Sequence, residues 1–128
     1  IPLRPALIAQ GKWNPASGAA AVTELLSRGE TFSALVASND DMAIGAMKQL
    51  HDSGIATPEK VSVIGFDDVA IAPYMVPSLS SVRVPVTEMI KETISRLIFM
   101  LDGGEFTCQQ TFSGELVLRD SVIDGPHR

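Results

Sequence analysis

Near the middle of the chain lies the segment Val61-Ser62-Val63-Ile64-Gly65-Phe66, which is followed directly by Asp67-Asp68. The segment is almost continuously apolar, as expected for a short β-strand that is buried on both of its faces. Two earlier apolar runs, residues 6–9 and 32–37, have a similar length and composition. We therefore predict three buried strands, which are typical of a parallel sheet with helices packed against it.

Amphipathic segments alternate with these strands. Asn14 and Pro15 are an N-cap followed by proline at the first helical position, and the helical spacing of apolar residues after them predicts a helix over residues 15–28. The same spacing predicts a helix over residues 41–53, with aspartates at the positive end of its dipole. This alternation indicates an α/β fold, a parallel sheet with flanking helices.

The C-terminal part of the chain contains one more helix between two extended segments. We predict an extended segment at 80–84, a long helix at 86–102 after Pro85, and a strand-like run at 112–118. The long helix carries an apolar stripe that Phe99 and Met100 widen around its last turn. A helix that is apolar on two sides needs two partners, so this helix is expected to serve a second packing surface.

Length and charge limit the range of possible functions. The chain has 128 residues, which suits one small domain, and its hydrophobic content of 45% predicts a packed core. The net charge is -5, and the 10 basic residues are spread along the chain without a cluster. We therefore do not expect these residues to contact DNA directly. The chain opens with Ile1 rather than Met, and we expect it to be a piece of a longer protein.

Several kinds of chemistry lack the residues that they need. Cys108 is the only cysteine, which excludes a disulfide, and His51 and His127 lie far apart, so we predict no metal site and no cofactor. The sequence has no Gly-rich phosphate loop and no nucleophile motif, so we predict no catalytic residues and no enzyme. No apolar run approaches the roughly 20 residues of a membrane-spanning helix.

Polar and aromatic side chains follow the three predicted strands. Trp13 comes after the first strand, Asn39 after the second and Asp67 after the third. Ligands of open parallel sheets bind outside the carboxyl ends of the strands. Carboxylate and amide groups bond adjacent hydroxyls, and an indole face covers the C–H face of a pyranose. The three residues therefore predict a binding site for a neutral sugar or polyol.

Each of these residues also has a purely structural interpretation. Asn39 and Asp40 fit the cap of the following helix, Asp67 and Asp68 fit a solvated loop, and Trp13 fits a partly exposed core residue. Neither aspartate pair has a Lys, Arg or His companion at a suggestive spacing. These alternatives remain open from the residues alone.

Three motifs resemble the lactose/galactose repressor (LacI/GalR) family in their order and spacing. They are Ala37-Ser38-Asn39-Asp40-Asp41-Met42-Ala43-Ile44-Gly45-Ala46, Pro58-Glu59-Lys60-Val61-Ser62-Val63-Ile64-Gly65-Phe66-Asp67-Asp68 and Leu116-Val117-Leu118-Arg119-Asp120-Ser121. The resemblance covers essentially the whole chain. It implies a sensor of the type I periplasmic-binding-protein-like fold, in which two α/β subdomains hold the effector between them, preceded by a helix-turn-helix DNA-binding domain.

The resemblance also implies how the chain is divided. Residues 1–84 and 112–128 correspond to the C-terminal subdomain, which is incomplete, and residues 85–111 correspond to a crossover helix that belongs to the absent N-terminal subdomain. The DNA-binding domain is absent as well. By position, Trp13 matches the aromatic residue that lines the sugar pocket, Asn39 the amide and Asp67 the carboxylate that bond the sugar hydroxyls.

The implied function is effector sensing and dimerisation in a cytoplasmic, sugar-responsive repressor. Galactose or a close relative is the expected effector, and operator DNA is expected to be bound only through the absent N-terminal domain. The family's homodimer interface falls on helix 41–53 and on the loop at residues 71–76. The candidate interface residues are Ile44, Met47, Lys48, Tyr74 and Met75, of which Met47 also fits an ordinary core position.

One alternative shares the same fold and the same chemistry at the strand ends. A lobe of a periplasmic sugar-binding transport protein would also combine a parallel sheet with an amide, a carboxylate and an aromatic ring. The motif at residues 116–121 and the dimer-type surface favour the repressor.

Overall fold

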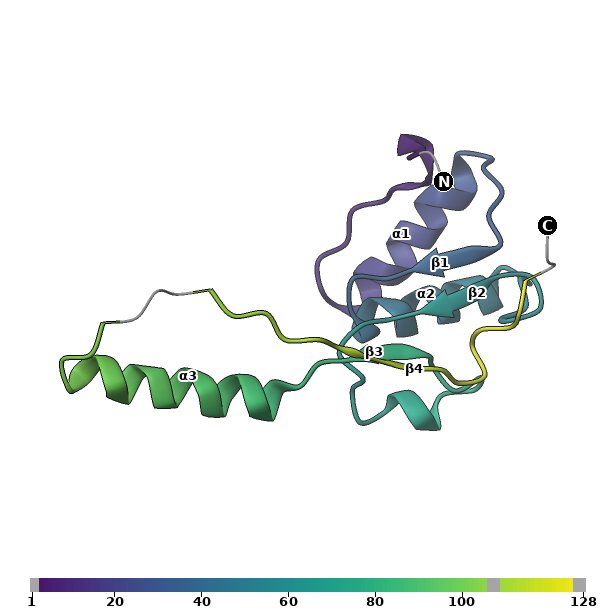
Figure 1. Ribbon diagram of the computed structural model, residues 1–128. Coiled ribbons are helices and arrows are strands. Elements are labelled where there is room, and N and C mark those ends of the chain that lie inside the picture. Colours follow the sequence, from purple (N-terminus) through teal and green to yellow (C-terminus); the bar gives the residue numbers. More distant parts are fainter. Residues whose placement is uncertain (1–2, 106–108, 126–128) are drawn as a thin grey trace.

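The computed structural model of the chain describes residues 3–105 and 109–125. It shows a body in which two helices pack on a small sheet, and a long helix that extends away from this body (Figure 1). The elements in order are the 3-10 helix Pro5–Leu7, α1 (Pro15–Ser27), β1 (Ala34–Val36), α2 (Asp40–Asp52), β2 (Ser62–Ile64), the 3-10 helix Ala72–Tyr74, β3 (Ser81–Arg83), α3 (Val86–Leu101) and β4 (Glu115–Val117).

The sheet is parallel from β1 through β2 to the β3 segment, so the predicted parallel sheet is confirmed with two of its three predicted strands. β1 and β2 pair in parallel, with Leu35 opposite Val63. Parallel bridges continue the sheet from β2 to the β3 segment, one of them between Ile64 and Ser80. β4 pairs antiparallel with β3, with Val82 opposite Leu116. The chain therefore crosses from β1 to β2 through α2 and from β2 to β3 through the segment that contains the 3-10 helix Ala72–Tyr74, and β4 then returns as an antiparallel strand.

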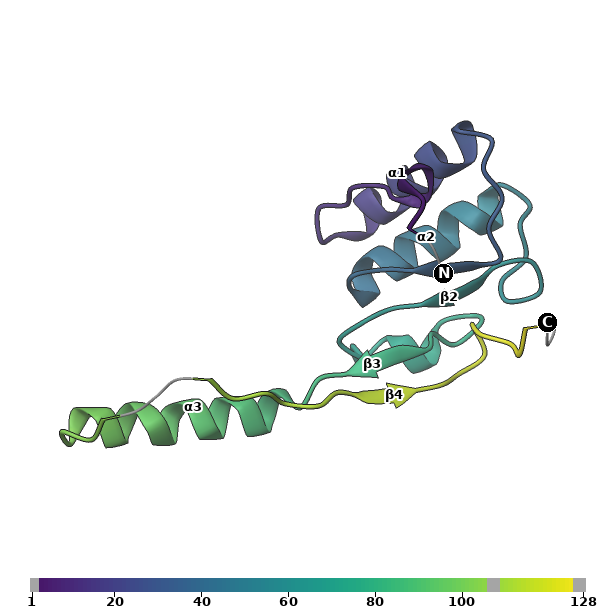
Figure 2. The ribbon, with the colours of Figure 1, turned by 45° about the horizontal axis from the view of Figure 1, so that its top comes forward.

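α1 and α2 lie against each other closely because each carries a glycine at the contact (Figure 2). A Cβ on Gly45 would lie 1.8 Å from the carbonyl oxygen of Pro15, and a Cβ on Gly18 would lie 2.1 Å from that of Met42. Only glycine permits these approaches. The core between the helices and the sheet is built from buried apolar residues that include Val22, Met42, Ala43, Met47, Leu50, Val63 and Leu79.

The predicted helices begin where the local signals place them. Asn14 Oδ1 accepts a hydrogen bond from the Ser17 backbone N–H at 2.9 Å, and Pro15 is the first helical residue of α1. Asn39 Oδ1 accepts one from the Met42 backbone N–H at 3.0 Å at the start of α2. All three predicted helices are confirmed to within one residue at each end.

The prediction of a buried strand at residues 6–9 is wrong. Residues 5–7 form a 3-10 helix with proline in its first turn, and Ile8 is 52% exposed. The carbonyl oxygens of Ala6 and Ile8 accept hydrogen bonds from Arg28 Nη1 at 2.9 and 2.7 Å. Because a side chain satisfies these carbonyls, the segment needs no neighbouring strand. β1 is accordingly the edge of the described sheet, and Val36 is 81% exposed rather than buried.

α3 leaves the body after β3, and the chain returns through β4 (Figures 1 and 2). None of its residues is buried, and the apolar side chains Ile90, Ile94 and Leu97 are each more than half exposed. Within the described ranges, no helix has the length and apolar character needed to span a membrane. No group of three His, Cys, Asp or Glu residues that could hold a metal occurs there either. Cys108 and His127 lie outside the described residues.

Candidate functional site

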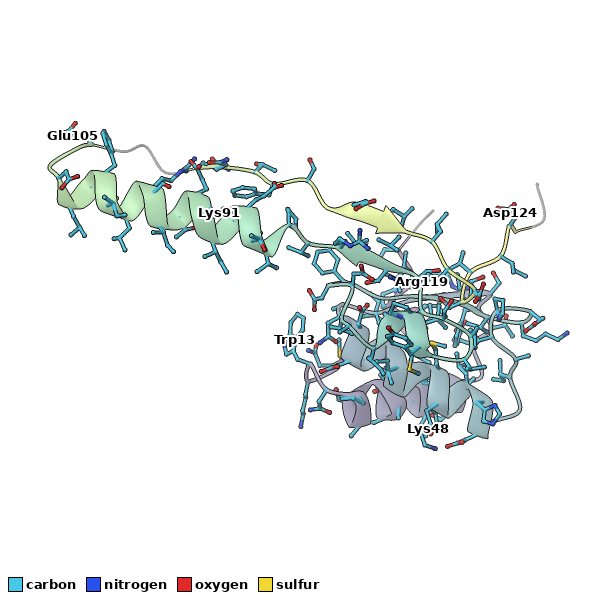
Figure 3. All side chains as sticks on the ribbon, turned by 90° about the horizontal axis from the view of Figure 1, so that it is seen from below. Trp13, Lys48, Lys91, Glu105, Arg119 and Asp124 are labelled. Carbon is cyan, nitrogen blue, oxygen red and sulfur yellow. The ribbon has the colours of Figure 1, made fainter. Side chains whose placement is uncertain are left out.

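The site begins at the junction of the segment before α1 with the start of α2. Asn39 uses its Oδ1 to cap α2, so its interpretation as an N-cap is right, and its Nδ2 donates to the Trp13 carbonyl oxygen at 3.4 Å. Trp13 is 68% exposed. Its side chain stands at the edge of the body on the side from which α3 extends (Figure 3). The cap therefore holds the Trp13 backbone while the indole faces solvent.

Asp67 is brought to the same edge by a backbone contact between α2 and β2. The Asp40 N–H donates to the Phe66 carbonyl oxygen at 2.8 Å. Asn39 and Asp67 are the sequence neighbours of these two residues, so the hydrogen bond holds their backbones close together. The Asp67 N–H donates to the Val82 carbonyl oxygen at 2.9 Å. Its carboxylate makes no hydrogen bond or ion pair with any residue that the structure describes. The ends of β1 and β2 thus place Asn39 and Asp67 at one edge, and Trp13, which follows no strand in the described residues, is joined to Asn39 through its backbone carbonyl.

The Asp67 carboxyl is electrostatically unfavourable as an anion. Partial burial raises its pKa, and the neighbouring carboxylates of Asp40 and Asp41 raise it further. Because the residue is exposed, a ligand hydroxyl that donates to this carboxyl would replace a hydrating water.

Backbone strain is concentrated at this edge. In the described part of the chain, three residues other than glycine have a left-handed φ: Trp13 at 61°, Asp67 at 109° and Asp68 at 55°. Such conformations cost on the order of 1–3 kcal/mol each and persist only where surrounding contacts impose them. All three positions belong to the site or adjoin it, which is typical of a segment whose side chains are held for a ligand.

Asp40 is the residue that imposes the loop conformation, a role that the sequence did not reveal. Its side chain is completely buried. Oδ1 accepts a hydrogen bond from Ser81 Oγ at 2.6 Å, and Oδ2 accepts one from the Val69 backbone N–H at 2.8 Å. A Cβ on Gly65 would lie 2.0 Å from Asp40 Oδ1, so glycine is required beside it. The buried carboxylate ties the start of α2 to the loop that presents Asp67.

Asp68 has two arginine partners, although the sequence shows no basic residue at a suggestive spacing from either aspartate pair. Arg83 Nε donates to its Oδ2 at 2.7 Å, and Arg119 Nη2 donates to its Oδ1 at 2.5 Å. These partners are 15 and 51 residues away along the chain, too far for a spacing pattern to indicate. The Asp68 side chain is 7% exposed, so the interpretation as a solvated loop residue is wrong for it.

The pKa of Asp68 reflects these contacts. Burial acts to raise the pKa, but the hydrogen bonds and charges of Arg119 and Arg83 outweigh burial and lower it. Two adjacent aspartates therefore have opposite environments. Asp68 is a firmly ionised anchor, and Asp67 is the free acceptor.

An apolar groove of about 530 Å³ runs beside the site. It lies between residues 7–11, α1 and the exposed edge of β1, and it includes Trp13 but neither Asn39 nor Asp67. The polar candidates therefore stand on an open surface next to the groove rather than inside it. This open surface offers a hydrogen-bond acceptor, an amide donor and an aromatic ring, which can bind the hydroxyls and the C–H face of a sugar. A second surface would be needed to enclose the ligand.

The five candidate interface residues fall into two groups. Met47 is 5% exposed and packs in the core, which agrees with its alternative interpretation, and Ile44 and Met75 are half-buried against that core. Lys48 is exposed and forms an ion pair with Asp52 at 2.5 Å, and Tyr74 is 79% exposed. Lys48 and Tyr74 are thus the candidates that offer most of their surface to a partner.

Comparison with known proteins places nearly all of the chain in one family. The family of periplasmic binding protein-like domains matches residues 3–122. The HTH-type transcriptional regulator AscG of Escherichia coli K12 is 71% identical over 123 residues, 96% of this chain and 37% of AscG. The HTH-type transcriptional regulator GalR of Salmonella typhimurium SL1344 is 41% identical over 124 residues, 95% of this chain and 36% of GalR. The chain thus spans little more than a third of these curated relatives.

Solved structures are similar to the chain over nearly all of its length. A sugar-binding transcriptional regulator of the LacI family from Escherichia coli, complexed with phosphate, matches with a TM-score of 0.88 and 71% identity, covering 96% of this chain and 44% of that one. The transcriptional regulator CelR in complex with cellobiose matches with a TM-score of 0.90 and 30% identity. The match covers 94% of this chain and 37% of CelR. The lac repressor dimer bound to operator and an anti-inducer matches with a TM-score of 0.84 and 26% identity. The match covers 89% of this chain and 40% of the repressor chain.

Proposed function

The chain belongs to the periplasmic binding protein-like domains of the LacI/GalR regulators, and from this premise we propose that it is the effector-sensing and dimerising part of a sugar-responsive repressor. The membership confirms the resemblance drawn from the sequence motifs and the α/β fold class. The relatives named above are transcriptional regulators rather than enzymes.

The observation that carries the proposal is the unpaired carboxylate of Asp67. It is presented on a strained left-handed backbone beside Asn39, whose amide nitrogen also reaches Trp13. The residue is exposed, so its carboxylate remains available as an acceptor for a ligand hydroxyl, while the strained backbone fixes where it is presented. Trp13 would cover the apolar face of the same ring.

The proposed effector is galactose or a close relative. The chain is 71% identical to AscG and 41% identical to GalR, so identity alone does not single out one sugar. The CelR structure contains cellobiose, a disaccharide of glucose units. D-galactose and cellobiose are therefore the two probes that separate a monosaccharide effector from a larger one.

A second lobe would complete the site and cover the surfaces that the chain leaves open. Residues 85–111 are assigned in this proposal to that lobe, because α3 has no buried residue and carries a broad exposed apolar face. The groove at the free edge of β1 is apolar in the same way. DNA would be contacted only by a separate N-terminal domain, and the regulator would act as a homodimer in the cytoplasm.

Sugar would act by shifting a population between two arrangements of the lobes. A ligand changes such an equilibrium only by its difference in affinity for the two states. Sugar held between Asp67 on one lobe and groups on the other would favour the closed arrangement. If operator DNA favours the other arrangement, sugar and operator oppose each other by the same coupling free energy.

Calorimetry on the full-length protein that carries this chain tests the proposal. D-galactose and cellobiose are titrated into the wild type, into Asp67→Asn and into Asp124→Asn, an exposed aspartate at the far end of the body (Figure 3). A hydrogen bond to a charged group contributes roughly 1.5–3 kcal/mol, so Asp67→Asn should weaken binding about tenfold or more. If Asp67→Asn and Asp124→Asn bind the sugar with equal affinity, Asp67 is not a sugar ligand.

The transport alternative has no support from the relatives. AscG, GalR and CelR are all named as transcriptional regulators. Binding of operator DNA to the full-length protein, measured with and without sugar, would separate the two functions, because a transport protein has no operator to bind.

A further inference from the structure

The two connections between the body and α3 start from neighbouring strands. The chain leaves the body at Arg83, the last residue of β3, and α3 begins three residues later at Val86. It returns along β4, which begins at Glu115 and pairs with β3 (Figures 1 and 2). Any change in the position of α3 relative to the body must therefore pass through the ends of these two strands.

One carboxylate holds both strands. Asp68 Oδ2 accepts from Arg83 Nε at 2.7 Å, and Asp68 Oδ1 accepts from Arg119 Nη2 at 2.5 Å, two residues beyond the end of β4. Arg83 Nη1 also donates to Glu115 Oε2 at 3.0 Å, and Arg119 Nη1 donates to the Leu79 carbonyl oxygen at 2.6 Å. The planar guanidinium fork fixes direction as well as distance, so these contacts define how the strand ends lie.

The same residue is rigidly joined to the candidate sugar ligand. Asp68 follows Asp67 directly, and both have left-handed φ values. The Asp68 backbone N–H donates to Ser81 Oγ at 3.0 Å, and Ser81 Oγ donates to the buried Asp40. Because both sides of the loop are held, a movement of the Asp67 backbone on ligand binding would also rotate Asp68 against its two arginines.

We propose that Asp68 is a positioning residue that couples sugar bound at Asp67 to the two strand ends that lead to α3. The inference rests on the proposed function, because it takes Asp67 as the sugar ligand. Asp68 itself touches no sugar in this scheme. Its carboxylate transmits the position of Asp67 to Arg83 and Arg119, and so to the placement of the segment that the proposal assigns to the second lobe.

The first test needs no sugar. In the full-length protein that carries this chain, with its native cysteines replaced, spin labels are placed at Thr23→Cys on α1 and at Lys91→Cys on α3 (Figure 3), and an excess of unlabelled protein removes distances between molecules. Wild type and Asp124→Asn should give a narrow distribution of label distances, and Asp68→Asn a distinctly broader or shifted one. Arg83→Gln, which changes a half-exposed partner, serves as a second variant if Asp68→Asn fails to fold. Distributions identical to wild type in a folded variant would overturn the proposal.

The second test measures coupling in the full-length protein. Affinity for operator DNA is compared without sugar and with saturating D-galactose or cellobiose. Coupling factors of this kind are typically about 5–150-fold, and Asp68→Asn should reduce the factor by about fivefold or more. A variant that destabilises the protein without altering communication would leave the factor unchanged at saturation, and that result would overturn the proposal. A wild type that responds to neither sugar contradicts the proposed function instead, and the label distances then decide alone whether Asp68 holds the strand ends.

Discussion

The backbone N–H of Asp40 donates a hydrogen bond to the carbonyl oxygen of Phe66 at 2.8 Å. This bond joins the first residue of α2 to the segment that follows β2, and it sets Asn39 beside Asp67. The buried side chain of Asp40 continues the connection through Ser81 and the Val69 backbone. A residue that begins a helix thus organises the loop that presents the candidate acceptor, and several consequences of that arrangement can be measured.

Asn39 should have two separable roles, a helix cap and a hydroxyl donor. Asn39→Ala removes the acceptor for the Met42 N–H and should lower the free energy of unfolding by about 1 kcal/mol, and it should also weaken sugar binding. Asn39→Asp keeps the capping oxygen and loses the amide donor, so it should weaken binding with little loss of stability. Chemical denaturation and calorimetry on each variant give the two quantities.

Asn14→Ala is the matched control for Asn39. Asn14 caps α1 in the same way, at 2.9 Å from the Ser17 nitrogen, and the proposal gives it no contact with sugar. The two alanine variants should therefore lose similar stability, and only Asn39→Ala should lose affinity. An equal loss of affinity in both would show that Asn39 acts only as a cap.

Asp67 should make stability fall as pH rises through the acidic range. Burial and the charges of Asp40 and Asp41 raise the pKa of Asp67 in the folded chain above its ordinary value of 3.8. The folded state then binds more protons than the unfolded state between the ordinary and the raised pKa, so stability is lost as pH rises through that window. Asp67→Asn should remove this part of the pH dependence. For each protein the free energy of unfolding is compared between about pH 3 and about pH 7. This difference removes any effect of the substitution that does not depend on pH.

Asp68 should show the opposite pH dependence. Burial opposes ionisation, but Arg119 and Arg83 lower the pKa of Asp68 below its ordinary value. Its contribution is therefore complete above the ordinary pKa and is lost as pH falls through the lowered one. Asp68→Asn should lower the free energy of unfolding near neutral pH by roughly 2 kcal/mol, since it weakens two charged hydrogen bonds at a nearly buried carboxylate. Denaturation at several pH values measures both effects, and a variant whose stability varies with pH as in the wild type would contradict the assignment.

The helix starts and the positions of Asn39 and Asp67 at strand ends were predictable because their signals are local. Asn14 and Pro15 mark the start of α1, and Asn39 and Asp67 each lie within two residues of the end of an apolar run. The packing partners were not predictable in this way. Asp68 meets arginines 15 and 51 residues away, and residues 6–9 bond to Arg28 instead of forming a strand. Helical spacing likewise placed Met47 on a helix but did not show that its side of α2 faces the core.

The exposed apolar face of α3 should make the isolated chain associate with itself. Ile94, Leu97 and Ile98 are 52%, 55% and 54% exposed, and complete burial of such a side chain contributes roughly 1.5–3 kcal/mol. Sedimentation velocity over a range of concentrations should therefore show association that Leu97→Glu abolishes. Ser95→Glu adds the same charge at an exposed polar position on the same helix and should leave the association unchanged. A wild-type chain that stays monomeric at all concentrations would mean that the apolar face of α3 does not drive association. That result would also weaken the assignment of α3 to a second lobe.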